Sequence, residues 1–304
     1  MAEKSSTHKE YVAGFLAGIA TVVVGHPFDT VKVKLQKHNT EGHQIKYKNG
    51  LHCAARILKN EGVTGLYRGA TSSFVGVAFE SSLFFGMYSQ MKQSLQGRLK
   101  SSGPDPLVII PSAAYSGAAI SFVLCPSELL KCRMQVQGTD SLIPNSVRYN
   151  GPIDCALRTI ETEGVRGIFR GGVATLLRES LGGTVFFCVY EYVRHFMHSK
   201  LEAASHDHKS LTEFGTGVIS GGLAGVAFWS AVLPLDVAKT IIQTDPDIRS
   251  TRNPFQVLHS VYRMAGIRGC YAGLGPTLLR AFPANAAAIA TLEFAIKFLG
   301  IERE

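Results

Sequence analysis

The chain has 304 residues, a formal net charge of +8 at pH 7 and a pI near 9.2. A basic balance suits nucleic acid, anionic lipid or acidic ligands, but no block of Arg and Lys interleaved with aromatic residues supports a nucleic-acid partner. The six Cys form no Cys-x-x-Cys pair and no His/Cys cluster with zinc spacing, so we expect reduced, mostly buried thiols, no metal site and no cofactor.

The first ten residues, MAEKSSTHKE, are short and polar. They lack the basic and apolar regions of a signal peptide and the Arg-rich amphipathic helix of a transit peptide. We therefore expect any targeting information to lie further along the chain.

A ten-residue motif occurs three times, as PFDTVKVKLQ from Pro27, PSELLKCRMQ from Pro126 and PLDVAKTIIQ from Pro234. Each copy has a Pro, an acid two residues later, a Lys three after the acid and a Gln four after the Lys. A second signal follows each copy and reads EGVTGLYRG, EGVRGIFRG or AGIRGCYAG. Its closing glycines are 102 residues apart in both steps, at Gly69, Gly171 and Gly273. A fixed period of this kind indicates three structural repeats, which we place at residues 10–98, 107–199 and 212–300.

Each repeat contains two candidate membrane spans. Three stretches have no charged residue: 11–28, 107–127 and 214–235. Three more follow the glycine signals with one or two charges each: 70–91, 172–190 and 274–292. About 20 apolar residues cross a bilayer as a helix, so the sequence predicts an all-α membrane protein with six transmembrane helices in three parallel repeats. The alternative is a soluble helical protein, but the mean hydropathy of +0.13 also fits spans that line a wet interior.

A short amphipathic stretch separates the two spans of each repeat, at residues 50–60, 152–161 and 254–264. Each stretch begins at Gly or Pro and mixes aliphatic with basic residues. We expect these segments to be helices that lie on the membrane surface.

The Pro-x-acid-x-x-Lys element, followed by Glu-Gly and aromatic-Arg-Gly, resembles the mitochondrial carrier family over roughly residues 10–300. The third copy departs from the family pattern at three positions: Ile241, Ala265 and Ala272. The resemblance implies a pseudo-threefold carrier fold in the mitochondrial inner membrane, with the amphipathic helices on the matrix side and both termini facing the intermembrane space. It also implies a monomer that transports and is not an enzyme, with cardiolipin bound at the ends of the amphipathic helices.

The threefold motif has a role as a gate in this family. Pro removes a backbone hydrogen bond and kinks its helix, which brings three helix ends towards a common axis. The resemblance pairs Asp29 with Lys131, Glu128 with Lys239, and Asp236 with Lys32, in a ring that closes the pathway on the matrix side. Three Gln residues are expected to brace the pairs: Gln36, Gln135 and Gln243. The alternative is a set of flanking surface charges, which their threefold spacing disfavours.

In this family the opposite, cytoplasmic gate has the pattern aromatic-acid-x-x-basic on the second span of each repeat. The three second spans of this chain match that pattern to different degrees. Residues 190–194 (YEYVR) fit, residues 88–92 (YSQMK) lack the acid, and Glu293 has Lys297 one place late. We therefore expect a weak gate of about one good pair, built from Lys92, Tyr190, Glu191, Arg194 and Glu293.

Four charged residues fall near the middle of the even-numbered spans: Glu80, Arg178, Glu179 and Arg280. Counted from the closing glycines, they lie roughly 10–17 Å along their helices. A charge at that depth costs at least about 2.5–3.5 kcal/mol unless it meets water or a partner. We therefore interpret them as a substrate site in preference to a purely structural network.

Charges of both signs suit an amino acid, and the Arg-Glu step at 178–179 resembles the amino-acid branch of carriers. Glu80 resembles the acid that ornithine, lysine and arginine carriers place against the substrate side chain. We expect Arg280 to bind the α-carboxylate, Glu179 the α-ammonium and Glu80 the distal cation, while Arg178 either holds Glu179 or shares the carboxylate. Two further residues are candidates: Trp229, facing the cavity or anchoring at the interface, and Asn285, touching the substrate.

The sequence thus predicts a transporter of basic amino acids (arginine, ornithine, lysine, histidine) that works by alternating access and exchange, similar to plant-type arginine/ornithine carriers. One alternative is a carnitine/acylcarnitine carrier, since that branch also resembles the run RAFPAN at 280–285. Glu80 argues against it, because carnitine has no second cation. The other is an uncoupling-type proton leak or a regulatory membrane scaffold. Hydrolysis has no support, because no nucleophile elbow or triad pattern is present.

Overall fold

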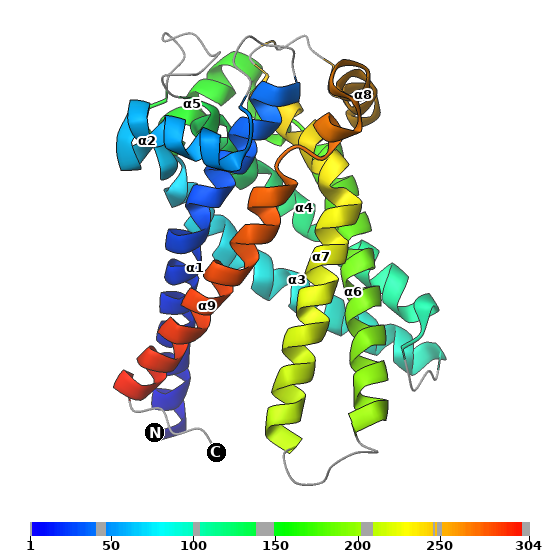
Figure 1. The fold of residues 1–304 in the computed structure, drawn as a ribbon. Helices are drawn as coiled ribbons and strands as arrows, with labels where there is room; N and C mark the ends of the chain where they lie inside the picture. Colours follow the sequence, from blue (N-terminus) through cyan, green and yellow to red (C-terminus); the bar gives the residue numbers. More distant parts are fainter. Residues whose placement is uncertain are drawn as a thin grey trace.

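The computed structural model describes residues 2–40, 47–99, 104–137, 149–201, 209–245, 247 and 251–299. Within these residues the regular secondary structure is entirely helical (Figure 1). Six helices are long: α1 (Ala2–Thr40), α3 (Ala70–Leu99), α4 (Pro106–Val136), α6 (Gly172–Leu201), α7 (Lys209–Thr244) and α9 (Leu274–Leu299). Three are shorter: α2 (Gly50–Leu66), α5 (Pro152–Glu163) and α8 (Pro254–Cys270), and a 3₁₀ turn, η2 (Val165–Phe169), follows α5. The predicted order of long, short and long helices, repeated three times, is confirmed.

The long helices form a bundle with two different ends. The three short helices gather at one end, and α1 begins and α9 ends at the other (Figure 1). The first and last helices of the chain, α1 and α9, pack against each other, as do α3 with α4, α4 with α6, and α6 with α7. Both chain ends therefore share one side, as parallel two-helix repeats require.

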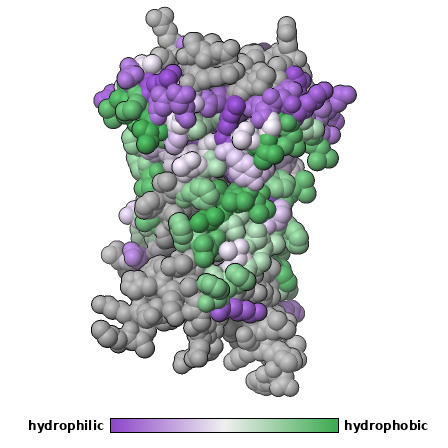
Figure 2. All heavy atoms as spheres, turned by 90° about the vertical axis from the view of Figure 1, so that its left-hand side faces the viewer, coloured by the Kyte–Doolittle hydropathy of each residue, from purple (hydrophilic) through white to green (hydrophobic). Residues whose placement is uncertain are grey.

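One face of the bundle carries an apolar band (Figure 2). Hydrophobic residues form a band across the middle of the face in Figure 2, and hydrophilic residues surround the end that carries the short helices. Among the described residues, three helical segments are long and apolar enough to cross a membrane: Pro106–Val136, Val165–Lys200 and Ile219–Thr244.

The glycine signals have a backbone cause. The glycine of each Glu-Gly or Ala-Gly step has a positive φ, at Gly62 (68°), Gly164 (72°) and Gly266 (64°). The closing glycines do as well, at Gly69 (80°), Gly171 (82°) and Gly273 (88°). Residues with a Cβ rarely adopt this conformation, so the two turns that lead from each short helix into the next long helix need glycine.

Two of the short helices run further than their amphipathic patterns predicted. We expected ends at 60 and 264, but α2 continues to Leu66 and α8 to Cys270. The helix resumes for one turn after the break at the positive-φ glycine, which a hydropathy pattern does not register. Each short helix packs on the long helix before it in the chain. Cys155 of α5 is fully buried in the structure. This burial raises the pKa of its thiol to about 11.

Candidate functional site

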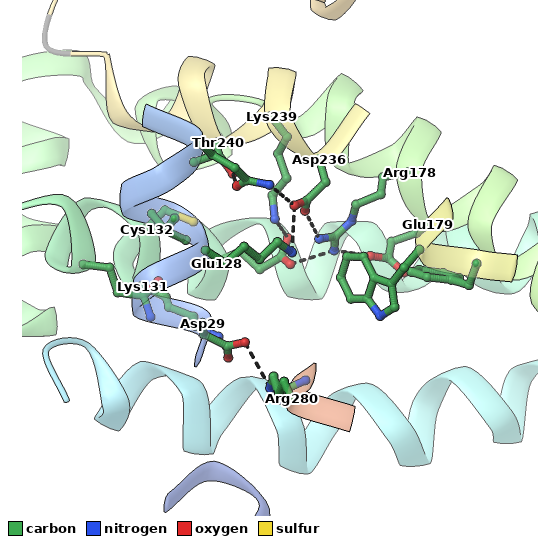
Figure 3. A pocket seen from close by; sticks show the side chains of 16 residues that line it. Asp29, Glu128, Lys131, Cys132, Arg178, Glu179, Asp236, Lys239, Thr240 and Arg280 are labelled. Carbon is green, nitrogen blue, oxygen red and sulfur yellow. Dashed lines mark hydrogen bonds and ion pairs between the residues drawn. The ribbon is translucent and has the colours of Figure 1, made fainter. Parts of the chain in front are cut away.

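A polar cavity of about 170 Å³ lies between α1, α4, α6, α7 and α9 (Figure 3). Its lining is dominated by charge. The lining acids are Asp29, Glu128, Glu179 and Asp236, and the lining bases are Lys32, Lys131, Lys239, Arg178 and Arg280. The threefold motif and three of the four deep charges predicted from the sequence therefore share one space.

The motif acids and lysines form a closed ring of ion pairs between α1, α4 and α7. Within each copy the acid and Lys are three residues apart, which places both on one face of the helix. The Nζ–carboxylate distances are 2.7 Å for Lys131–Asp29, 2.5 Å for Lys239–Glu128 and 2.8 Å for Lys32–Asp236. All three pairings implied by the resemblance are present, and the ring ties α1 to α4, α4 to α7, and α7 to α1.

The three motif glutamines do not behave alike. Gln36 donates from Nε2 to Asp236 Oδ2 at 2.9 Å and accepts from Thr240 Oγ1 at 2.7 Å, so it braces one pair. Gln135 instead donates to Thr30 Oγ1 at 3.2 Å, and neither amide atom of Gln243 has a hydrogen-bond partner among the described residues. The expected brace on every pair was wrong for these two, because the period fixes the helix position but not the side-chain conformation.

Arg178 lies inside this ring rather than apart from it. Its Nη1 is 2.9 Å from Asp236 Oδ1, and its Nη2 is 2.6 Å from Glu128 Oε1. The same Nη2 pairs with the carboxylate of Glu179, its neighbour in sequence. Of the two roles left open for Arg178, holding Glu179 is the one its contacts support, and the ties to two ring acids were not expected.

Close backbone packing sets the height of this pair. A Cβ at Gly117 of α4 would lie 2.4 Å from the carbonyl oxygen of Glu179. Only glycine lets α4 approach α6 at that point, and the approach brings Arg178 and Glu179 to the level of the ring.

Arg280 of α9 reaches the remaining ring acid. Its Nε is 3.0 Å from Asp29 Oδ1. Gly25 of α1 makes room for this side chain, because a Cβ there would lie 2.8 Å from the Arg280 Nε. Sequence reasoning missed Gly25, which lies just outside the motif that begins at Pro27.

Trp229 lines the cavity, which decides between its two predicted positions. The cation over its ring is a gate residue: Lys32 Nζ is 4.0 Å from the indole centroid. Such a contact is worth about 0.5–2 kcal/mol. In this arrangement the indole therefore supports the Lys32–Asp236 pair.

At the opposite end, polar contacts connect α3 and α6. Glu191 pairs with Lys92 and also accepts a hydrogen bond from Tyr88 at 3.2 Å. Arg194 contacts its own helix, with Nη1 3.3 Å from the Tyr190 hydroxyl. Among the described side chains one interhelical ion pair therefore forms here, the number the sequence predicted. Three predicted site residues, Glu80, Asn285 and Glu293, have side chains outside the described part of the structure.

Comparisons with known proteins identify the family to which this architecture belongs. The mitochondrial carrier protein family matches residues 3–99, 105–201 and 211–303, which is nearly the whole chain in three copies. The chain belongs to the mitochondrial carrier family.

Among relatives of this carrier, the mitochondrial arginine transporter BAC1 of Arabidopsis thaliana is 65% identical over 98% of this chain and 96% of its own length. The mitochondrial basic amino acids transporter of Bos taurus is 36% identical over 95% and 91%. A carnitine/acylcarnitine carrier-like protein of Arabidopsis thaliana is also 36% identical, over 96% and 98%. The carrier is accordingly a multi-pass protein of the mitochondrial inner membrane, and these relatives are transporters.

A second layer of ion pairs in the carrier lies on the short-helix side of the ring. In repeat 1, Glu61 forms ion pairs with Lys34 at 2.7 Å and with Arg68 at 3.0 Å. In repeat 2, Glu163 pairs with Arg133 at 2.5 Å and with Arg170 at 3.3 Å, and the exposed Arg252 of repeat 3 lies 3.8 Å from it. The sequence contained a signal for these contacts, because Ile241, Ala265 and Ala272 replace all three partners together in repeat 3.

The arginines of this layer also connect one repeat to the next. Arg68 donates to the carbonyl oxygen of Gln137 at 2.9 Å, and Arg170 donates to that of Asp247 at 2.7 Å. These bonds link repeat 1 to repeat 2 and repeat 2 to repeat 3. Ala272 has no group that could make the corresponding bond from repeat 3 to repeat 1.

Proposed function

We propose that this carrier exchanges basic amino acids (arginine, ornithine, lysine and histidine) across the inner membrane by alternating access. The observation that carries the proposal is the cavity, where carboxylates and cations lie together beside a closed ring of ion pairs. A basic amino acid carries both signs of charge and can pair with both kinds of group. The 65% identity to an arginine transporter supports the same substrate class, whereas the carnitine relatives are matched at lower identity.

We assign the parts of the substrate as follows. Arg280 binds the α-carboxylate, because among the described residues it pairs with Asp29 alone and its side chain is 27% exposed. Glu179 binds the α-ammonium, and Glu80 the distal cation of the side chain. Asn285 adds a hydrogen bond on α9, and Trp229 forms one wall of the site.

The two sets of ion pairs act as gates in this proposal. The ring of Asp29, Glu128, Asp236 and their lysines closes the matrix side, and Lys92, Tyr190, Glu191, Arg194 and Glu293 close the cytoplasmic side. The termini then face the intermembrane space. The carrier works as a monomer, and the headgroup phosphates of cardiolipin bind at the N-termini of the short helices, where backbone N–H groups favour anions.

A flux assay with reconstituted carrier tests the function. Uptake of labelled arginine is measured in proteoliposomes with and without internal ornithine, and labelled carnitine and proton leak are measured in the same vesicles. Exchange predicts uptake that depends on internal ornithine. Carnitine uptake without arginine uptake would support the first alternative, and proton leak without amino-acid flux the second.

The assignment of Glu80 has its own test. Glu80→Gln should abolish arginine and lysine uptake, because the distal cation loses its partner, while the unfolding temperature stays that of the wild type. Unchanged uptake would remove Glu80 from the site.

A further inference from the structure

The three motif glutamines share one position in the repeat but not one role. Gln36, Gln135 and Gln243 are all fully buried, and a buried amide without a partner is costly. Even so, only Gln36 braces an ion pair of the ring. The cause must lie in residues around the glutamines, because the period gives all three the same place on their helices.

A threonine one turn from the acid holds Gln36 on the ring. Thr240 of α7 donates from Oγ1 to Gln36 Oε1 at 2.7 Å, and Gln36 Nε2 donates to Asp236 Oδ2 at 2.9 Å. Asp236 and Thr240 are four residues apart, so they lie on the same face of α7; both point into the ring in Figure 3. A glutamine that accepts from this hydroxyl therefore has its NH₂ group beside the acid.

A different threonine holds Gln135 away from the ring. Gln135 Nε2 donates to Thr30 Oγ1 at 3.2 Å, and this hydroxyl in turn donates to the carbonyl oxygen of Leu66 at 2.8 Å. Thr30 directly follows Asp29, and consecutive side chains of a helix point about 100° apart. The amide also lies 3.5 Å from Nε2 of His26, but that nitrogen already donates to a backbone carbonyl at 2.9 Å. Thr30 is therefore the hydrogen-bond acceptor that directs this glutamine.

Two positions of the repeat thus decide where a glutamine goes. The position three after the Pro holds Thr30, Leu129 and Val237, and the position directly after the Lys holds Val33, Cys132 and Thr240. Each glutamine meets the helix of the preceding repeat. There α1 offers Gln135 a hydroxyl at the first position, and α7 offers Gln36 one at the second. The corresponding helix for Gln243 is α4, which has no hydroxyl at either position, and neither amide atom of Gln243 has a hydrogen-bond partner among the described residues.

We propose that Thr30 and Thr240 are positioning residues that select which motif glutamine braces the matrix gate. Thr240 holds Gln36 on the ring, and Thr30 holds Gln135 away from it. This selection rests on the proposed function of the ring as a gate, but not on the identity of the substrate.

The same substitution at the two threonines should have opposite effects. Valine keeps the shape of threonine and removes the hydroxyl. Thr240→Val loosens the brace of Gln36, whereas Thr30→Val frees Gln135 to brace the ring. If the two hydroxyls only supported the fold, both variants would instead open more easily.

Labelling of the empty carrier measures this opening. The reporter is Cys132, which lines the cavity, in a background whose other five cysteines are replaced. A membrane-impermeant maleimide is added only to the compartment that faces the short helices. Because one buried hydrogen bond is lost or gained, Thr240→Val should label about fivefold faster than the background carrier, and Thr30→Val about fivefold slower.

A double substitution separates the glutamine from the other contact of Thr30. In a Gln135→Leu carrier, Thr30→Val should no longer slow the labelling, because no amide remains to be released. Slower labelling in that carrier as well would mean that Thr30 acts through Leu66 and α2, and the proposal would be wrong.

Lys131→Ala separates this selection from the gate itself. It removes a whole ion pair with Asp29 and should label faster than either threonine variant. If it does not, the ring is not the barrier, and the gate and the selection fail together. If it labels faster while both threonine variants keep the background rate, the gate stands and the selection alone is refuted.

A last measurement needs no labelling and adds a hydroxyl instead of removing one. Cys132→Thr repeats the residue of Thr240 in α4, the helix that Gln243 meets. It should let Gln243 brace Glu128 and raise the unfolding temperature in detergent by about 2–4 °C. The matched control is Cys132→Val, which repeats Val33 and adds no hydroxyl, so it should bring no such rise. Equal unfolding temperatures for the two variants would overturn the proposal.

Discussion

Repeats 1 and 2 differ from repeat 3 directly below the ring. In the first two, a buried glutamate pairs with two basic side chains of its own repeat: Lys34 and Arg68 around Glu61, and Arg133 and Arg170 around Glu163. In repeat 3 the three positions hold Ile241, Ala265 and Ala272. There an apolar cluster that includes Ile241, Val257, Val261 and Cys270 fills the space between α7 and α8.

Repeat 3 shows that the fold forms without this buried ion-pair network when all three positions are replaced together. Well-packed apolar residues often replace a buried ion pair at little cost, whereas loss of one partner leaves a buried charge uncompensated. The glycine turns persist in all three repeats. The backbone geometry is therefore a property of the repeat, and the ion pairs are one of two ways to fill it.

The largest effect is expected from a substitution that removes only the acid of the network in repeat 2. Glu163→Gln leaves Arg133 and Arg170 buried without a carboxylate, and should lower the free energy of unfolding in detergent by about 3–5 kcal/mol. The control is the triple variant Arg133→Ile, Glu163→Ala, Arg170→Ala, which gives repeat 2 the residues of repeat 3. It should be more stable than the single variant, and a larger loss in the triple would contradict the comparison.

A smaller effect is expected from the reverse change. Ala265→Glu introduces a carboxylate where the two positions that supply its basic partners in the other repeats hold Ile241 and Ala272, and it should cost about 1–3 kcal/mol. Adding Ile241→Arg and Ala272→Arg should recover most of that loss, as measured by the unfolding temperature. If the added arginines bring no recovery, repeat 3 cannot accommodate the network of its neighbours.

The smallest effect concerns the feature that the repeats share. Gly164→Ala and Gly266→Ala should each cost about 1–2 kcal/mol, because a Cβ is strained at a positive φ. At neither glycine would the added Cβ meet another atom within 4 Å, so the cost should be the same in a repeat with the network and in one without. Unequal losses by thermal unfolding would show that the network also supports the turn.

Much of the fold and of the ring could be predicted from the sequence, because both follow from a period. The spacing of Asp29, Lys32 and their counterparts fixes which face of each helix carries them, and the family pattern supplied the pairing. The same period found the turn glycines, although their positive φ became clear only with coordinates.

The contacts that were missed are those that a period does not describe. Counting residues along α6 placed Arg178 at the depth of a substrate site, but depth ignores the length and direction of an arginine side chain, which here reaches Asp236. Gln135 and Gln243 occupy the predicted positions and point elsewhere. The partners of Glu61 lie 27 residues before it and 7 after it, and no single spacing joins them.

Because α1 and α9 lie side by side and their free ends emerge together (Figure 1), the chain is nearly a closed loop of three units. A short linker across those ends, with new ends cut between α3 and α4, should give a circular permutant that starts at the second unit. Tags on the old and on the new ends should be accessible from the same side of the membrane. Comparing the two proteins therefore tests whether the original ends and the α3–α4 connection share a compartment.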